Sequence, residues 1–425
     1  MTDGAVGDDR MTRRTLLASA TVGGLTGCAL GRPRVAAVSG GGRLPTRIDR
    51  IQTFPVRYPT IGYFKFFEGP PGSPSGRPAV LVKITADDGT FGWGESVPIP
   101  RWSYETLESA ASTIEKYLAP ALIGVDPFDL TAVHRIMDLN IAPGFSKGAP
   151  ITKSGIDMAL HDLCGRATGL SLAQRWGRPQ GGSISLSWTL NPRKLDEIGP
   201  LVEAGRKRGY TNFNVKVAPD PRFDVAMCRR VRKLVPDGFL WADANGGYDP
   251  ATAMAVAPKL ADVGVDVLEQ PVRPNRISAY RALRRQGALP ILMDEGVVSP
   301  ADLITFLRQD MLDGVAMKPA RCGGLEPARR QVEILEDAGL LFLGSGLTDP
   351  DVSLAATLAL YGSYKLARPA ALNGPQFLAE SVLKTRLTAK DGKLAVPTGP
   401  GLGIEVDERK LADLVRRSRG AGSPK

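Results

Sequence analysis

Five charged residues end successive apolar runs of the sequence at nearly constant spacing. They are Lys216, Asp243, Glu269, Asp294 and Lys318, separated by 27, 26, 25 and 24 residues. Each lies where an apolar run gives way to a turn, as in FNVKVAPD and FLWADANG. One such residue alone is usually a salt-bridge partner at a sheet edge. Five in phase, with charges ordered plus, minus, minus, minus, plus, indicate a common site.

The three acidic members of this series carry the first chemical prediction. Asp243, Glu269 and Asp294 would bring three carboxylates to one point, where they would repel one another unless a cation lay between them. Oxygen-only ligands with room for water suit Mg²⁺, and Mn²⁺ would fit the same set. Zinc sites normally contain His or Cys, and neither residue lies near these positions in the sequence. The series therefore predicts a Mg²⁺ site.

The two lysines flank the acidic residues and predict proton transfer. A bound cation would stabilise the charge that forms when a substrate carboxylate becomes an enediolate, while one lysine removes the proton from the adjacent carbon. That lysine acts as a base only when neutral, so burial and nearby positive charge must lower its pKa. The other lysine, protonated, would deliver a proton to the opposite face or help a leaving group depart.

Repeated strand–helix units must position these residues. From about Ser183 onward short apolar strands alternate with amphipathic helices, and more than five such units in a row favour a closed parallel barrel. The predicted strands are SISLSWTL, TNFNVKV, GFLWADAN, VDVLEQP, PILMDEG, DGVAMKP and LLFLGSG. Each charged residue then lies at the carboxyl-terminal rim, where barrel active sites form. With Lys216 on the second strand and Lys318 on the sixth, the lysines would face each other.

A different pattern precedes the barrel and indicates an α+β domain. Its predicted strands are 47–58, 79–86 and 90–97, and its predicted helices are 103–122 and 152–169. Asp87-Asp88-Gly89 reads as a hairpin turn, and Ser103 as a helix cap. The Gly-, Pro- and Ser-rich loop 59–78 is typical of a functional lid or a disordered insert. Residues 387–407 look hairpin-like again, so we expect the chain to return to this first domain.

The N-terminus predicts export. Arg13-Arg14 precede an apolar run that is too short to span a bilayer, as in a twin-arginine signal over residues 1–27. The sequence LTGC resembles a bacterial lipobox, which would make Cys28 a lipid-anchored first residue of an extracytoplasmic protein. The alternative is a plain signal cleaved near VAAVSG, with Cys28 lost. Residues 28–45, rich in Gly, Arg and Ala, read as a linker.

Composition excludes several other classes. The chain has 425 residues, 43% of them apolar and 23% charged, which is ordinary for a globular protein. Its net charge of +10 is concentrated partly near both ends and includes no basic helix with interleaved aromatics, so we expect no nucleic-acid partner. Cys164, Cys228 and Cys322 have no metal-like spacing and read as thiols. His134 and His161, the two histidines of the chain, lie in helical patterns and read as structural.

Seven short motifs in a fixed order resemble the enolase superfamily, specifically the mandelate racemase/muconate lactonizing enzyme family. They are GWGES, ALHDL, DAN, LEQP, MDEG, KPARCGG and PGLG. The resemblance runs from about Arg47 to Asp407. It implies a modified TIM barrel, (β/α)7β, with an α+β N-terminal capping domain. The implied parts are a capping domain at 46–182, a barrel at 183–370 and a C-terminal segment at 371–425 that returns to the cap.

The resemblance also assigns roles residue by residue. Asp243, Glu269 and Asp294 match the metal ligands of the family. Lys216 matches the second lysine of its K-x-K strand, and Lys318 the sixth-strand lysine of the muconate cycloisomerase group. The mandelate racemase group instead uses a histidine from the seventh strand, and LLFLGSGLTD has none. The sequence therefore indicates the two-lysine group.

Two departures from the family pattern bear on the substrate. Asn214 stands where the first lysine of K-x-K is usual, so we expect either that the pKa of Lys216 is lowered less or that an amide holds the substrate carboxylate in place of a cation. Dipeptide epimerases of the family have Asp-x-Asp near the last strand, where this chain has Ala371 and Asn373. A dipeptide with a free amino group is therefore not the expected substrate.

Aromatic residues in the cap loops suggest what the substrate carries besides its carboxylate. We expect Tyr63, Phe66 and Trp102, with Asn214 and Asn245, to contact it. Aromatic rings could pack an apolar acid or hold an N-alkylated cation. The hypothesis is a small carboxylate with a substituted or cyclic amine, such as a proline derivative or a betaine. The alternative is that the aromatics only pack the cap on the barrel.

The sequence thus predicts a Mg²⁺-dependent racemase or epimerase, and we expect a homo-oligomer as is common in this family. A dehydratase, of the hydroxyproline dehydratase type, or a muconate cycloisomerase would use the same enediolate and the same residues. A third alternative is an exported binding lipoprotein that has kept the barrel and lost catalysis.

Overall fold

The computed structural model describes residues 44–67, 75–144 and 146–420. The predictions of an export signal, of a lipid anchor at Cys28 and of most of the linker lie outside these residues. Within them, no helix combines the length and the apolarity needed to cross a membrane.

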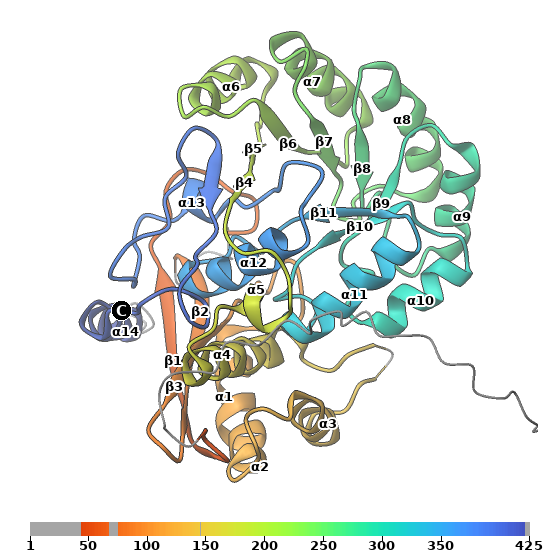
Figure 1. Ribbon diagram of the computed structural model, residues 1–425. Coiled ribbons are helices and arrows are strands. Elements are labelled where there is room, and N and C mark those ends of the chain that lie inside the picture. Colours follow the sequence, from red (N-terminus) through yellow and green to blue (C-terminus); the bar gives the residue numbers. More distant parts are fainter. Residues whose placement is uncertain (1–43, 68–74, 145, 421–425) are drawn as a thin grey trace, which may run out of the picture. The chain divides into compact units, whose positions relative to one another are not determined.

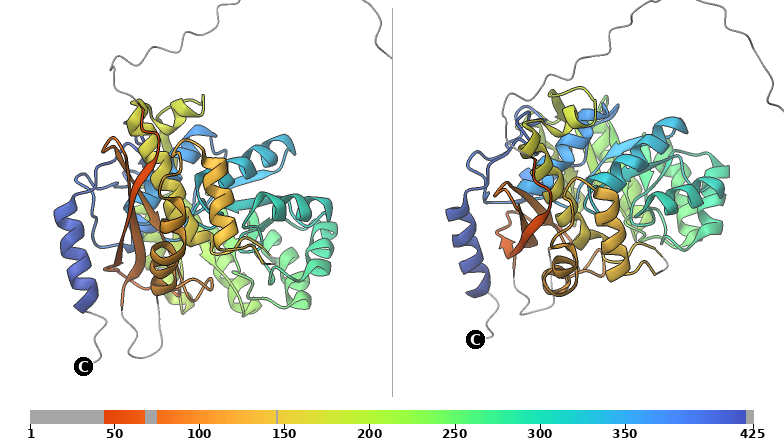
Figure 2. Two further views of the ribbon diagram at one scale, coloured as in Figure 1. Left: turned by 90° about the horizontal axis from the view of Figure 1, so that it is seen from below. Right: turned by 60° about the horizontal axis from the view of Figure 1, so that its bottom comes forward.

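The capping domain is built on a three-stranded antiparallel sheet. It contains β1 (Ile48–Tyr58), β2 (Arg77–Ala86) and β3 (Phe91–Ser96), in the order β1-β2-β3. The predicted hairpin turn connects β2 to β3, and the amide of Gly89 donates to the carbonyl of Ala86 at 3.0 Å. Figures 1 and 2 show this sheet covered by helices on one side and by the C-terminal helix on the other.

Five helical segments and a π-helical turn complete the first part of the chain. They are α1 (Leu107–Thr113), the π turn η1 (Ile114–Leu118), α2 (Ala119–Leu122), α3 (Leu130–Asn140), α4 (Pro150–Thr168) and α5 (Leu172–Arg175). The prediction of a Ser103 cap is wrong: Thr106 caps α1 instead, because its hydroxyl and that of Ser109 form a reciprocal capping box.

Helix α4 is the central helix of the capping domain and is buried along nearly its whole length. It can lie directly on β3 because the strand presents glycines at the contact. A methyl group on Gly94 would come within 1.9 Å of the Gly155 carbonyl oxygen, and one on Gly92 within 2.2 Å of the Ala159 carbonyl oxygen. The GWGES motif is thus a packing surface for α4.

The barrel is a curved parallel sheet of seven strands that curls around its own core (Figure 1). The strands, in spatial order, are β5 (Ser187–Leu190), β6 (Asn212–Lys216), β7 (Leu240–Asp243), β8 (Val267–Glu269), β9 (Ile291–Met293), β10 (Gly314–Met317) and β11 (Leu341–Gly344). Residues 370 and 371 close it, since Ala370 bridges to Leu186 and Ala371 bridges to Ser345, both in parallel. The predicted modified TIM barrel with an N-terminal cap is confirmed.

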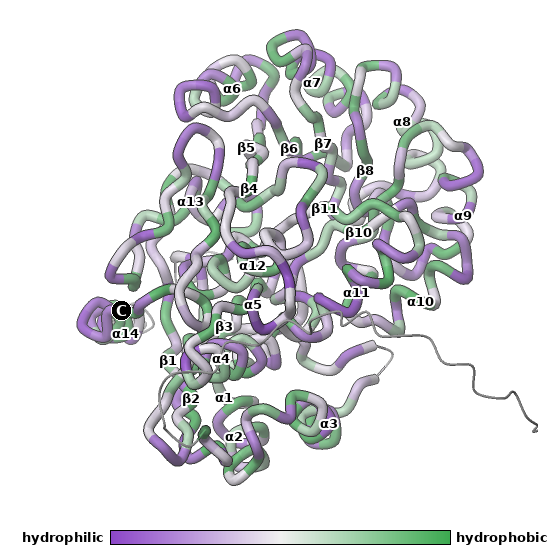
Figure 3. Tube along the Cα trace, viewed as in Figure 1, coloured by the Kyte–Doolittle hydropathy of each residue, from purple (hydrophilic) through white to green (hydrophobic). Residues whose placement is uncertain are grey.

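Helices after each strand cover the outside of the barrel. They are α6 (Ile198–Arg206), preceded by the 3-10 turn η2 (Leu195–Glu197), then α7 (Pro221–Leu234), α8 (Pro250–Asp262), α9 (Ile277–Gln286), α10 (Pro300–Arg308), α11 (Leu325–Asp337) and α12 (Asp351–Ser363). Asp220, Asp249 and Ser299 cap three of them, each followed by proline at the first helical position, which needs no amide donor there. Figure 3 shows hydrophilic and hydrophobic residues alternating along these outer helices.

The C-terminal segment runs over both parts of the chain. It includes α13 (Gly374–Phe377), β12 (Lys393–Ala395) and α14 (Glu408–Gly420). The predicted hairpin of 387–407 is only partly present, because β12 pairs with β4 (Ser183–Ser185) at the base of the barrel. Helix α14 then packs on the cap strand β1, where the Arg57 amide donates to Ser418 Oγ at 2.8 Å.

Candidate active site

The five charged residues identified in the sequence lie at the same end of the barrel. Lys216 and Asp243 are register partners at the ends of β6 and β7, and Asp243 is the partner of Glu269 at the end of β8. Asp294 and Lys318 directly follow β9 and β10. Parallel strands end at a common edge, so residues about 25 positions apart in sequence become neighbours.

The lysines and carboxylates pair with each other. Lys216 Nζ donates to Asp243 Oδ2, and Lys318 Nζ donates to Asp294 Oδ2 and lies 3.6 Å from Glu269 Oε1. The guanidinium of Arg321 donates to the other oxygen of Asp294. As the side chains lie in this structure, no group of three or more His, Cys, Asp or Glu residues in the described part of the chain is arranged to hold a metal ion.

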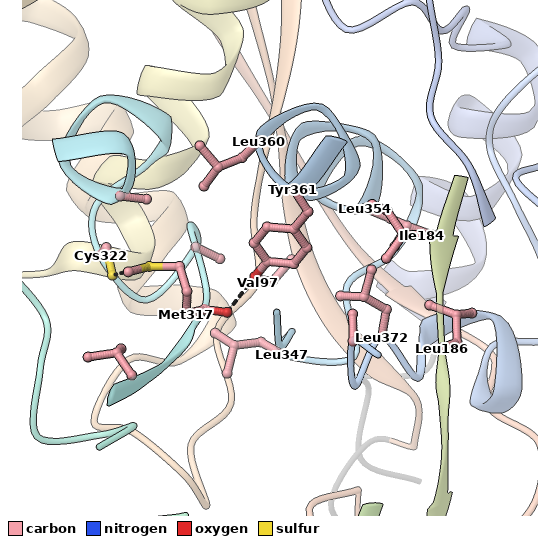
Figure 4. Packing of buried hydrophobic residues seen from close by; sticks show 14 of the residues in the cluster. Val97, Ile184, Leu186, Met317, Cys322, Leu347, Leu354, Leu360, Tyr361 and Leu372 are labelled. Carbon is pink, nitrogen blue, oxygen red and sulfur yellow. Dashed lines mark hydrogen bonds between the residues drawn. The ribbon is translucent and has the colours of Figure 1, made fainter. Parts of the chain in front are cut away.

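Backbone contacts hold these side chains in place. Tyr361 of α12 donates its hydroxyl to the carbonyl of Met317, the residue before Lys318 (Figure 4). The amide of Asp294 donates to Gln270 Oε1 at 2.8 Å. The same glutamine donates to the Val272 carbonyl at 3.0 Å, so the turn after β8 fixes the end of β9.

The acidic residues at the rim are almost fully buried, and burial raises the pKa of two of the carboxyl groups. Glu269 is 1% exposed; burial, followed by the neighbouring Asp243 carboxylate, raises its pKa well above the ordinary value. Its Oε1 atom is buried without a hydrogen-bond partner. Burial also raises the pKa of Glu295 to about 8, with Asp294 as the next cause. In this arrangement the neutral forms of Glu269 and Glu295 are therefore favoured.

For the pKa of Lys318, the neighbouring charges outweigh the effect of burial. Burial acts to lower its pKa, but the Asp294 and Glu269 carboxylates outweigh it, so the pKa lies above its ordinary value. Lys318 is therefore held protonated in this arrangement. For Asp243, burial is outweighed by Lys216 and Lys318, and the pKa is lowered.

A divalent cation fits this set of donors. Three buried carboxylates on consecutive strands, one with an unpartnered oxygen, form the hard, all-oxygen environment that Mg²⁺ prefers. Asp243, Glu269 and Asp294 would hold it. Enzymes of the family identified below generally use Mg²⁺.

The two lysines open into one small pocket between the barrel rim and the cap. The residues that line it are Phe64, Phe66, Ile99, Trp102, Asn214, Lys216, Asn245, Lys318, Ser345, Gly346, Leu347, Thr348, Ala371 and Asn373. Its volume is only about 20 Å³, room for one or two waters. The pocket brings both lysines to a single enclosed space.

Amide groups in the pocket have unused hydrogen-bonding capacity. Asn214 Nδ2, Asn245 Oδ1 and Asn373 Oδ1 are buried without a hydrogen-bond partner. Asn245 also donates from Nδ2 to Glu295 Oε1 at 3.2 Å. Buried polar atoms are rarely left unpaired without a function, so these amides are candidate substrate contacts.

The cap loop, residues 59–67, brings the aromatic side chains to the pocket. The loop is fixed to the C-terminal segment: Thr60 bridges to Leu378, and the Phe64 ring stacks on Phe377 with centroids 4.9 Å apart. Tyr63, expected to contact the substrate, lies outside the pocket with its ring 3.8 Å from the Arg193 guanidinium. Phe64, at the start of a turn in which the Phe67 amide donates to its carbonyl, lines the pocket instead.

A second cap loop contributes Trp102, whose ring centroid lies 4.9 Å from Lys318 Nζ. The cap is joined to the barrel just beside it. Arg77, fully buried, donates from Nη2 to the Leu347 carbonyl at 2.7 Å. Glu95, also buried, accepts from the first amides of α12, those of Val352 and Ser353, at 3.0 Å. The cap and the β11–α12 loop therefore form one wall of the pocket.

Sequence reasoning missed several residues of the site. Arg321 lies within the KPARCGG motif, but nothing in the motif indicates that its side chain turns back onto Asp294. Ser345 and Thr348 follow β11 without a charge to mark them. Lys65 falls in the loop examined only for its aromatics. Of these, Lys65 and Arg321 have a charged residue type that could have drawn attention.

Comparisons with known proteins agree with this geometry. Residues 71–177 match the family model of the mandelate racemase / muconate lactonizing enzyme N-terminal domain, and residues 199–410 match the model described as enolase C-terminal domain-like. The chain is 34% identical to chloromuconate cycloisomerase CbnB of Cupriavidus necator, over 79% of this chain and 91% of that one. It is 27% identical to an N-succinyl-L-Arg/Lys racemase of Bacillus cereus, over 87% of this chain and 98% of that one.

A solved structure of muconate lactonizing enzyme from Pseudomonas fluorescens, complexed with muconolactone, superposes with a TM-score of 0.80 at 27% identity. The match covers 87% of this chain and 99% of that one.

Proposed function

Because the chain belongs to the mandelate racemase/muconate lactonizing enzyme family of the enolase superfamily, we propose that it is a racemase or epimerase acting at the carbon next to a carboxylate. Its relatives are isomerases, and the chain is an isomerase of this superfamily. The observation that carries the proposal is that Lys216 and Lys318, from strands four positions apart, line one pocket. Two proton carriers on opposite sides of one carbon can invert its configuration.

The remaining residues have roles that follow from their positions. One lysine removes the proton from one face of the substrate carbon, and the other returns a proton to the opposite face; the roles exchange for the reverse reaction. Mg²⁺ held by the three carboxylates would supply the positive charge that stabilises the enediolate. The unpartnered Asn214 amide would donate to the substrate carboxylate in place of a cation.

The substrate that we propose is a small amino acid whose nitrogen is substituted. A neutral, acylated nitrogen suits the site better than the quaternary nitrogen of a betaine, because Lys65, Lys216 and Lys318 already place positive charge around it. A cyclic proline derivative remains within the proposal if its nitrogen is acylated. The racemase relative, named for N-succinylated amino acids, supports the same choice.

The second candidate is a cycloisomerase. It is favoured by the relatives named chloromuconate cycloisomerase, which are more similar to this chain than the racemase is. A carboxylate oxygen of the substrate would add to the conjugated double bond to form the lactone C–O bond, and one of the same lysines would protonate the resulting enediolate at its α-carbon. A dehydratase would expel a β-substituent from the same enediolate. A non-catalytic binding protein is disfavoured, since these relatives are enzymes.

Solvent deuterium exchange tests the proposal. The enzyme is incubated in D₂O with Mg²⁺ and a panel of N-acyl amino acids, N-acyl prolines, hydroxy acids and cis,cis-muconate. We expect deuterium at the α-carbon together with the opposite enantiomer, loss of both after chelation of Mg²⁺, and loss of inversion in Lys216→Ala, where exchange is confined to the enantiomer that faces Lys318. Lactone formation without racemisation would select the cycloisomerase. Absence of exchange across the panel, with Mg²⁺ binding demonstrated by calorimetry, would overturn the enediolate proposal.

A further inference from the structure

A buried carboxylate outside the acidic cluster holds the turn that follows Lys216. Asp224, in the first turn of α7, is 3% exposed. Its Oδ2 atom accepts two hydrogen bonds, one from the amide of Ala218 at 2.9 Å and one from the hydroxyl of Tyr248 at 2.6 Å. Tyr248 lies in the segment after β7 and is also buried. Asp224 therefore connects the turn after β6 to the segment after β7.

These two bonds are not part of the capping of α7. Asp220 is the N-cap of this helix, and its side chain accepts from the amides of Arg222 and Phe223. The donors to Asp224 both lie outside the helix. Burying a carboxylate is costly unless polar groups surround it, so its direction toward the turn after β6 points to a role there.

The backbone at this turn is strained. Ala218 has a φ of 67°, in the left-handed region that a residue with a Cβ atom adopts at a cost. Such a conformation persists only where the surrounding structure fixes it. Packing contributes as well, since a methyl group on Gly247 would come within 2.8 Å of the Ala218 Cβ atom. The bond to Asp224 and this packing together set the course of the chain two residues after Lys216.

Lys216 and Lys318 are supported by different groups. The bond from Lys216 Nζ to Asp243 is a poor anchor, because that carboxylate is also a proposed metal ligand. The carbonyl of Lys318 accepts from the Arg321 amide at 3.0 Å, and Tyr361 donates to the carbonyl of the preceding residue. Neither of these contacts involves α7, so a change in α7 should affect the first lysine only.

We propose that Asp224 is a positioning residue for Lys216: through the Ala218 amide it fixes the turn that directs this lysine toward the substrate carbon. This inference rests on the proposed function and deepens it, because it assigns separate supports to the two acid–base groups. Loss of Asp224 should therefore impair proton transfer on one face of the substrate. The competing explanation is that Asp224 only stabilises α7 through the helix dipole, and its loss would then act on both faces alike.

Deuterium exchange at the α-carbon, measured on each pure enantiomer, tests this role. The samples contain Mg²⁺ in D₂O and the panel compound that the wild-type enzyme exchanges fastest. The enantiomer that Lys216→Ala no longer exchanges is the one that faces Lys216. In Asp224→Ala we expect this enantiomer to lose about 10²-fold in exchange rate, the cost of misplacing a reacting group by about 1 Å. The other enantiomer should keep its wild-type rate.

Two further variants test the same bonds. Asp224→Asn keeps an acceptor oxygen in a side chain of the same shape and should restore most of the rate. Tyr248→Phe removes one of the two bonds to the carboxylate and should slow the same enantiomer by a smaller factor. Asp129→Ala, which removes the N-cap of α3 in the capping domain, is the control for lost stability. It should lower the thermal unfolding temperature and leave α-carbon exchange of both enantiomers unchanged.

Amide hydrogen exchange examines the two turns without a substrate. Mass spectrometry follows peptides covering residues 211–219 and 314–322 in the Mg²⁺-loaded protein. In Asp224→Ala we expect faster amide exchange in the first peptide and no change in the second.

The outcomes separate this inference from the proposed function. Equal loss of α-carbon exchange for both enantiomers, full activity of Asp224→Ala, or unchanged amide exchange in the first peptide would each overturn the role of Asp224. If the wild-type enzyme exchanges no panel compound while Asp224→Ala loosens only the first peptide, the proposed function fails and the support of the turn after β6 stands.

Discussion

Replacing Lys318 by methionine separates proton exchange from inversion. Lys318 is 4% exposed, and its strand lies four positions from that of Lys216 in the barrel sheet. Methionine keeps most of the apolar stem against Trp102 but cannot carry a proton. Loss of one acid–base group costs about 10²–10⁴-fold in rate, or roughly 2.7–5.4 kcal/mol of transition-state stabilisation. We expect interconversion of enantiomers to fall by at least about 10²-fold in both directions.

The enantiomer whose α-proton faces Lys216 should behave differently. Lys216 can still remove and return its proton, so its exchange with D₂O should fall by less than about tenfold. The other enantiomer should neither exchange nor invert. Proton NMR of each pure enantiomer in D₂O measures both rates in a single sample.

The Lys318→Met variant keeps a hydrogen-bond partner for Asp294. Asp294 keeps its bond to Arg321, so the variant does not leave that carboxylate unpaired. Lys259→Met, an exposed lysine of α8, is the matched control and should retain full activity. Equal loss of exchange for both enantiomers, with the thermal unfolding temperature in Mg²⁺ unchanged, would refute the two-sided arrangement of lysines.

Two further predictions concern the cap. Burial is the main cause that raises the pKa of Glu95 from 4.5 to about 8. Its contribution to stability is therefore complete below pH 4.5 and is lost as the pH rises through 8. The free energy of unfolding of the wild type, relative to Glu95→Gln, should fall between pH 5 and pH 8 by up to about 1.4 kcal/mol per pH unit, and a difference that stays constant with pH in urea unfolding would contradict this. Gly94→Ala should destabilise the protein by at least about 2–3 kcal/mol because the added methyl group meets the backbone of α4. The control Gly199→Ala, with nothing within 4 Å of the added methyl group, should change the free energy of unfolding by less than about 1 kcal/mol. Equal free energies of unfolding for the two variants in chemical denaturation would show that the contact at Gly94 can relax.

The sequence alone determined the barrel strands and the position of each charged residue at a strand end. These features are local: a short apolar run gives the strand, and the residue where apolar character stops is the one at the rim. Because parallel strands align at a common edge, equal spacing along the chain became register pairing between Lys216, Asp243 and Glu269. The family resemblance followed from the same positions.

Tertiary structure alone decided how the site is enclosed. The cap loop has no regular pattern, and its direction is set by stacking of Phe64 on Phe377, a residue far along the chain. With that contact in place, Phe64 lines the pocket and Tyr63 lies beside Arg193. Side-chain direction in such a loop depends on what packs against it, and no local spacing encodes that partner.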